Sequence, residues 1–209
     1  MRRWIRGSML FFACAALHAQ QVDKDIARLV PDNMRFLSRL NADLTGDGVE
    51  DTIIVAADDR DFSATVTVFM RPHGRSLTDK RQTSDLQGID ALKLELSPLG
   101  PPTVKVAKGI LIVEHLVGGA NVRTAATYRY RFDGEEGRMR QIGLDAKRTS
   151  STLTVQLSWN ALNGARIFKK GNEPESRTTY KQGTVWMDLT RSADDMIDQA
   201  LGDASKGQK

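Results

Sequence analysis

The chain has 209 residues, of which 40% are hydrophobic and 27% charged, and its formal net charge at pH 7 is +4. This length fits one domain or at most two small ones. The composition is typical of a globular protein and excludes both a largely disordered chain and a polytopic membrane protein. The positive charge favours an anionic partner such as nucleic acid only if it lies in the folded part of the chain.

The first 19 residues have the pattern of a secretory signal peptide. Three arginines precede an apolar run over residues 9–17, and Ala19 offers a small residue for cleavage. That run is shorter than the about 20 residues that a membrane-spanning helix needs. Removing the three arginines from 30 basic residues leaves 27 against 26 acidic ones, so the mature chain is nearly neutral. We therefore expect a periplasmic or secreted protein with no transmembrane segment in its mature chain and no nucleic-acid partner.

The only cysteine of the chain, Cys14, lies within this segment. The mature protein therefore has no disulfide, no cysteine nucleophile and no thiolate metal site. An alternative is that Cys14 is acylated and anchors the protein to a lipid, since Ala13 supplies the small residue that precedes such a cysteine. Both alternatives place the protein in the cell envelope.

The pattern of apolar residues changes from helical to strand-like along the chain. Residues 23–40 have helical spacing, and Pro31 suits the first turn of a second helix, so we expect two short helices there. The unbroken apolar run 110–113 predicts a strand covered on both faces. Alternation of apolar and other side chains predicts further strands at 64–70, 92–96, 122–132, 153–159 and 185–189.

Two turn sequences predict β-hairpins, one at residues 133–137 and one at Asn163-Gly164. Ser192 is placed to cap a C-terminal helix that ends at residue 201. We therefore predict a mainly β (α+β) fold, with an antiparallel sheet or sandwich of about eight strands and short helices at the N- and C-terminal ends. Residues 20–201 are expected to form a single domain, and residues 202–209 a disordered tail.

Residues 43–51 have the pattern DxTxDGxxD, which predicts a calcium-binding loop. The ligands we expect are the side chains of Asp43, Thr45, Asp47 and Asp51 and the backbone carbonyl of Val49. Three carboxylates this close repel one another unless a cation lies between them. The alternative is an acidic turn without metal, because Asp and Gly are common in turns.

The loop resembles the calcium loops of FG-GAP and VCBS-type repeats, in which a DxNGDGxxD motif is followed directly by a hydrophobic strand. Residues 51–56, Asp-Thr-Ile-Ile-Val-Ala, match that continuation. Thr45 departs from the family at the position of the usual Asn or Asp, and the pattern occurs once in the chain. The resemblance implies a structural Ca²⁺ ion of modest affinity, on the order of 10⁻⁴ to 10⁻³ M.

A broader resemblance covers about 120 residues. The loop, the strand that ends at His115 before Gly118-Gly119, the aromatic segment 128–132 and the segment 159–164 are similar to the ordered landmarks of a group of small exported proteobacterial proteins with no assigned activity. This resemblance supports an envelope location and implies no catalytic residue.

Catalytic patterns are weak in this sequence. His115 lies beside Glu114 on a strand, where successive side chains point to opposite faces, so the two are not expected to act together. Asp58, Asp59 and Asp61 resemble an acidic turn more than the acid pair of a glycosidase. Trp159 and the two tyrosines of segment 128–132 could stack on a sugar or form core.

We therefore expect an exported binding protein without enzymatic activity, which carries a structural calcium loop and contacts another envelope protein or a glycan. The contact surface would be an exposed sheet face or the Gly118-Gly119 region. One alternative is an inhibitor or immunity protein that blocks an envelope enzyme. A less favoured one is a metal-dependent hydrolase.

Overall fold

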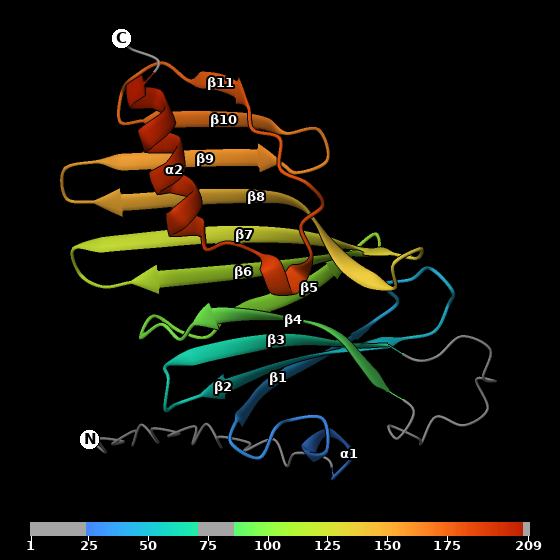
Figure 1. Ribbon diagram of the computed structural model, residues 1–209. Coiled ribbons are helices and arrows are strands. Elements are labelled where there is room, and N and C mark those ends of the chain that lie inside the picture. Colours follow the sequence, from blue (N-terminus) through green and yellow to red (C-terminus); the bar gives the residue numbers. More distant parts are fainter. Residues whose placement is uncertain (1–23, 71–85, 207–209) are drawn as a thin grey trace, which may run out of the picture.

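A computed structural model describes residues 24–70 and 86–206. In this part the fold is mainly β, as predicted, with eleven strands in two antiparallel sheets where we expected about eight (Figure 1). The predicted signal peptide and Cys14 lie outside the described residues. The four-stranded sheet has the order β1(Arg35–Ala42), β2(Asp51–Asp58), β3(Ser63–Met70), β4(Gln87–Glu95). The seven-stranded sheet has the order β11(Ser176–Thr179), β10(Ala165–Lys170), β9(Thr154–Asn160), β8(Arg138–Ser150), β7(Val122–Asp133), β6(Ile110–Gly118), β5(Thr103–Ala107).

The N-terminal prediction of two short helices is wrong in its second half. A single turn of helix, α1(Lys24–Ala27), is followed by strand β1, which pairs antiparallel with β2. The register shifts between Phe36 and Ser38, and this irregularity spaces the apolar residues as if they lay on a helix. Phe36 packs against a small apolar cluster and Leu37 against the main core, so the pairing with β2 overrides the helical spacing.

Strand β2 is buried at all eight of its residues. Ile53 and Val55 face the main core, while Ile54 and Ala56 face the smaller cluster formed with residues of α1 and β1. We had expected such two-sided burial at residues 110–113, and this expectation is wrong. Strand β6 instead alternates between buried and partly exposed residues, because its outer face meets solvent.

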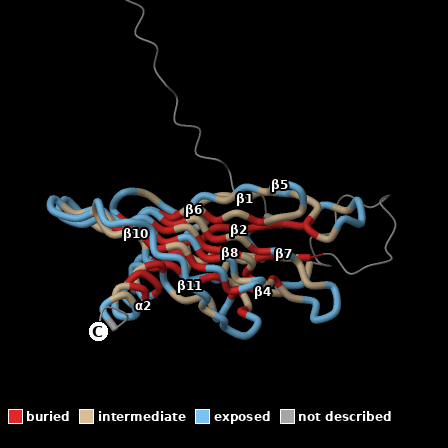
Figure 2. Tube along the Cα trace, turned by 90° about the horizontal axis from the view of Figure 1, so that it is seen from above, coloured by how far each residue is buried: buried red, intermediate tan, exposed pale blue. Residues whose placement is uncertain are grey.

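The main core joins both sheets to the C-terminal helix α2(Ala193–Lys206). Met196 and Ile197 of α2 are buried in the same cluster as Tyr128 of β7 and Leu157 of β9. The helix crosses the strands on one face of the seven-stranded sheet, and no described helix covers the other face (Figures 1 and 2). The sheet therefore has an inner face, toward α2, and an outer face.

Ion pairs and hydrogen bonds hold α2 at its place on the inner face. The Arg148 guanidinium lies 2.7 Å from the Asp194 carboxylate, and Arg166, only 6% exposed, lies 2.9 Å from Asp203. The Tyr128 hydroxyl accepts a hydrogen bond from the backbone N–H of Ala193 at 3.0 Å. These contacts fix both ends of the helix.

The C-terminal segment differs from the prediction in two ways. Residues 185–189 are not a strand, since Met187–Leu189 forms a 3-10 helix and only Val185 and Trp186 pair with β8. Helix α2 begins as predicted, with Ser192 Oγ accepting the N–H of Asp195 at 3.1 Å. It continues to Lys206, past the expected end at residue 201, so the segment 202–206 is helical.

Both predicted hairpins are confirmed, and a third depends on Gly118. Gly137 and Gly164 take positive φ angles of 66° and 77° in the predicted turns. Gly118, at the end of β6, has φ 112°, and a Cβ there would lie 2.2 Å from the carbonyl oxygen of Val122. This close approach of the two backbone segments accounts for the glycine at position 118, and a role in binding is not needed to explain it.

We predict that Gly118→Ala destabilises the protein by about 2 kcal/mol or more, because the new Cβ meets backbone and the φ angle is strained. Gly119→Ala is the matched control, since nothing lies within 4 Å of its added Cβ. Urea unfolding measures both variants. Equal stability of the two would contradict the geometry of this turn.

Candidate functional site

The predicted calcium loop, residues 43–51, connects β1 to β2. Gly46 and Gly48 have φ angles of 82° and 81°, which turn their amides toward Asp43. Asp43 Oδ1 accepts the N–H of Gly46 at 2.6 Å, and Oδ2 accepts the N–H of Gly48 at 2.8 Å. These bonds, the Gly48 one first, lower the pKa of the Asp43 carboxyl.

Two of the predicted ligands already lie together in this loop. Thr45 Oγ1 donates a hydrogen bond to Asp43 Oδ1 at 3.2 Å. That separation is the one expected of neighbouring oxygen ligands on a Ca²⁺ ion with metal-to-oxygen distances of about 2.4 Å. The structure thus brings the oxygen atoms at the first and third loop positions into one place.

The remaining predicted ligands make contacts with the backbone. Asp47 Oδ1 accepts the N–H of Val49 at 2.8 Å. Asp51 is 2% exposed, and its Oδ2 accepts the N–H of Leu44 at 2.9 Å, so it closes the base of the loop. Within residues 24–70 and 86–206, no three acidic, histidine or cysteine side chains are grouped closely enough to hold a metal ion. Calcium binding therefore requires a second carboxylate to turn toward Asp43, and it stays a prediction.

His115 is buried on the inner side of β6, at 7% exposure. Its Nε2 lies 2.8 Å from the carbonyl oxygen of Glu95, and burial lowers the pKa of its imidazole. Glu114 points to the outer face, where it pairs with Lys105. The two side chains therefore face opposite sides of the strand, as predicted, and form no catalytic pair.

The acidic turn after β2 is neutralised by neighbouring cations. The Arg60 guanidinium lies 2.8 Å from Asp58 and holds the pKa of that carboxyl well below its usual range. Asp59 pairs with Arg35 at 3.1 Å. This arrangement is a structural turn, as expected, and the lowered pKa of Asp58 is the opposite of what a general acid needs.

The aromatic side chains that could have stacked on a sugar belong to the core. Tyr128, Tyr130 and Trp159 are at most 3% exposed and face α2. Burial raises the pKa of the Tyr128 hydroxyl to about 12. The sequence left open whether these side chains stack on a sugar or form core, and the structure shows that they form core.

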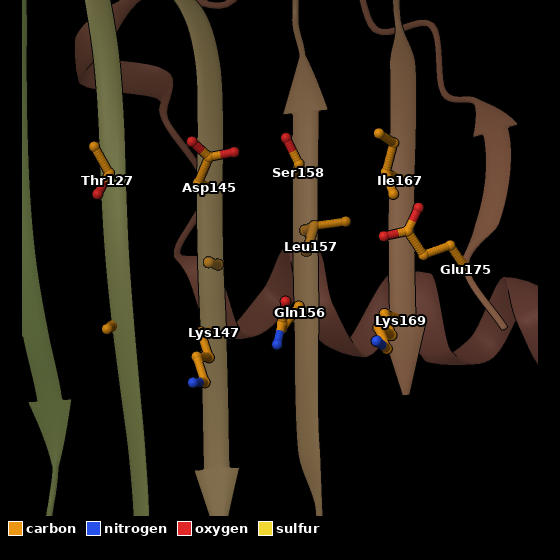
Figure 3. A pocket seen from close by; sticks show the side chains of 11 residues that line it. Thr127, Asp145, Lys147, Gln156, Leu157, Ser158, Ile167, Lys169 and Glu175 are labelled. Atoms are coloured by element: carbon orange, nitrogen blue, oxygen red, sulfur yellow. The ribbon is translucent and has the colours of Figure 1, made fainter. Parts of the chain in front are cut away.

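A candidate binding surface lies on the outer face of the seven-stranded sheet. A hollow of about 460 Å³ extends over β7, β8, β9 and β10, and we call it the outer hollow. Figure 3 shows its side chains on these strands, with α2 behind the sheet. The outer hollow is lined by Ala125, Thr127, Asp145, Ala146, Lys147, Gln156, Leu157, Ser158, Ile167, Lys169 and Glu175.

Among the described residues, the carboxylates of the outer hollow have ion-pair partners and its lysines do not. Asp145 is paired with Arg129 at 2.6 Å, and Glu175 with Arg177 at 3.3 Å. Lys147 and Lys169 are on the same face, and neither has a carboxylate within ion-pair distance among the described residues (Figure 3). Sequence alternation predicts that these side chains point outward, but it does not say which strands meet to form a hollow.

Comparison of the chain with known protein families, with curated proteins and with solved structures finds no match. Among the residues that the structure describes, no helix is long and apolar enough to cross a membrane.

Proposed function

We propose that this is an exported, non-enzymatic binding protein whose outer hollow holds an acidic segment of another envelope protein. The observation that carries the proposal is that α2 covers one face of the seven-stranded sheet, while the other face, which no described helix covers, has a hollow of about 460 Å³. Surfaces that bind partners are commonly concave and combine a few apolar contacts with placed polar groups.

The charges favour an acidic partner. Because Asp145 and Glu175 are each paired with an arginine, their charges are offset, whereas those of Lys147 and Lys169 are not. A carboxylate of the partner would offset these two lysines and add complementarity of charge, which increases the rate and specificity of association. Hydroxyl and amide groups of Thr127, Ser158 and Gln156 provide hydrogen-bond partners for a polypeptide.

A polypeptide fits this surface better than a glycan. The lining of the outer hollow includes no aromatic side chain on which a sugar ring could stack. Ile167, which is partly exposed on the outer face, offers a small apolar contact instead. The inhibitor or immunity protein is a special case of this proposal, in which the acidic segment belongs to an envelope enzyme. The hydrolase alternative gains no support, since Asp59 is held by Arg35.

We also propose that Ca²⁺ binds the loop at residues 43–51 and stabilises the start of β2. The adjacency of Asp43 Oδ1 and Thr45 Oγ1 supports this proposal. The motif makes Asp47 the carboxylate that would complete the site, and one of its oxygens already accepts the N–H of Val49 within the loop. The ion would act on the stability of the loop and take no part in a reaction.

We predict that the double variant Lys147→Glu/Lys169→Glu binds an acidic probe at least about tenfold more weakly, because two attractive charges become repulsive. The probe is a fluorescent poly-glutamate peptide, and anisotropy measures its affinity at low and at physiological salt. Lys181→Glu is the matched control, an exposed lysine outside the outer hollow. Equal binding by the control and the double variant, or no binding by the unchanged protein, would contradict the proposal.

We predict that millimolar Ca²⁺ raises the melting temperature of the unchanged protein and gives a saturable calorimetric signal, because an ion that binds only the folded state stabilises it. Asp47→Asn should abolish both effects, and Asp59→Asn, outside the loop, should leave them intact. Mg²⁺ at equal concentration tests for a general effect of divalent salt. A flat titration of the unchanged protein, or an undiminished response of Asp47→Asn, counts against the calcium site.

A further inference from the structure

Two arginines on the seven-stranded sheet lie directly opposite each other. Arg131 of β7 and Arg140 of β8 are register partners, near the end of the hairpin that joins these strands. Directly opposite residues of an antiparallel pair have Cβ atoms about 4.5–5.5 Å apart, so their side chains are neighbours. Like charges at such positions repel each other and destabilise the sheet.

Neither arginine has a polar partner among the residues that the structure describes. Seven arginines elsewhere in the described residues pair with carboxylates, among them Arg129 on the same strand as Arg131. In contrast, no hydrogen bond or ion pair is formed by the side chains of Arg131 and Arg140 within residues 24–70 and 86–206. Arg140 is partly exposed and Arg131 is exposed, so both residues can be reached from solvent.

A small cavity is lined by both arginines and by apolar residues, which we call the apolar wall. Its volume is about 120 Å³, and Phe132, Ile142 and Leu162 line it together with the two arginines and Asp133. The Asp133 carboxylate faces the hairpin turn, where its Oδ1 accepts the amides of Glu135 and Glu136, both at 3.2 Å. The cavity has room for one small group and a short apolar extension.

We propose that Arg131 and Arg140 together bind a single oxyanion, carried by a small ligand with an apolar part. Guanidinium groups are planar and match phosphate, sulfate and carboxylate groups through paired hydrogen bonds. An oxyanion bound between the two guanidinium groups attracts both of them and so offsets their mutual repulsion. Ile142 and Leu162 contact the apolar part of the ligand.

This oxyanion site is separate from the outer hollow, which we propose binds an acidic segment. The outer hollow includes neither Arg131 nor Arg140, and the oxyanion cavity includes neither Lys147 nor Lys169. Failure of one proposal therefore leaves the other standing, and charge reversal at the two lysines should not change oxyanion binding.

Titration with inorganic phosphate at constant ionic strength, followed by the NMR signals of the arginine Nε–H groups, tests the proposal. We expect the signals of Arg131 and Arg140 to shift along one saturating curve. Arg131→Gln and Arg140→Gln should each weaken phosphate binding at least about tenfold. Arg123→Gln is the matched control, because Arg123 is also on β7 and, among the described residues, donates only to the carbonyl oxygen of Gly119.

Thermal unfolding gives a second readout. Without phosphate, each glutamine variant should melt at the same or a higher temperature than the unchanged protein, since the like-charge contact is removed. Phosphate should raise the melting temperature of the unchanged protein only. Parallel titrations with sulfate, acetate and benzoate separate tetrahedral from planar anions and test the apolar wall. Non-saturating shifts that Arg123 shares, or equal affinity after either glutamine substitution, would overturn the proposal.

Discussion

One-sided burial of the seven-stranded sheet is the constraint on which the rest of the structure depends. Apolar residues alternate along its strands, so each strand contributes one side chain in two to the core. Tyr128, Leu144 and Leu157 bring their apolar groups to the inner face, where Met196 and Ile197 of α2 cover them. Burying side chains of this size stabilises a fold by about 1.5–3 kcal/mol each.

The same alternation leaves the outer face free for function. The described side chains of β7, β9 and β10 that point away from the core are exposed or partly exposed, so the outer face can hold charges that the core would exclude. Lys147, Lys169, Arg131 and Arg140 are such charges, and none has a carboxylate partner in the described part of the chain. The outer hollow and the oxyanion site therefore both follow from the burial of only one face of the sheet, although each rests on its own contacts.

Much of the sheet could be predicted from the sequence. Alternation at residues 122–132 and 153–159, together with the turn residues at 133–137 and at Asn163-Gly164, identified strands and hairpins that the structure contains. Ser192 was sufficient to locate the start of α2. These signals are local, because a turn or a cap is decided by a few neighbouring residues.

The errors arose where distant contacts decide the outcome. The register shift in β1 mimics helical spacing, and only pairing with β2 reveals a strand. Two-sided burial was expected at residues 110–113, yet it occurs in β2, because the turn of helix at residues 24–27 packs there. For the site, the sequence suggested the loop at 43–51 but neither the outer hollow nor the Arg131–Arg140 pair. Both depend on which strands are neighbours in the folded sheet. The sequence of a single strand does not show this.

The accessibility of the outer face to a partner is the central claim, and cysteine labelling tests it directly. In a chain with Cys14→Ser, single cysteines replace Gln156 or Ser158 on the outer face, and Asp195 on the exposed side of α2 as a control. All three should react quickly with a maleimide in the isolated protein. We predict that envelope extract slows the reaction at 156 and 158 and leaves 195 unchanged. Unchanged rates at the outer face, or equal slowing at all three positions, would contradict the account.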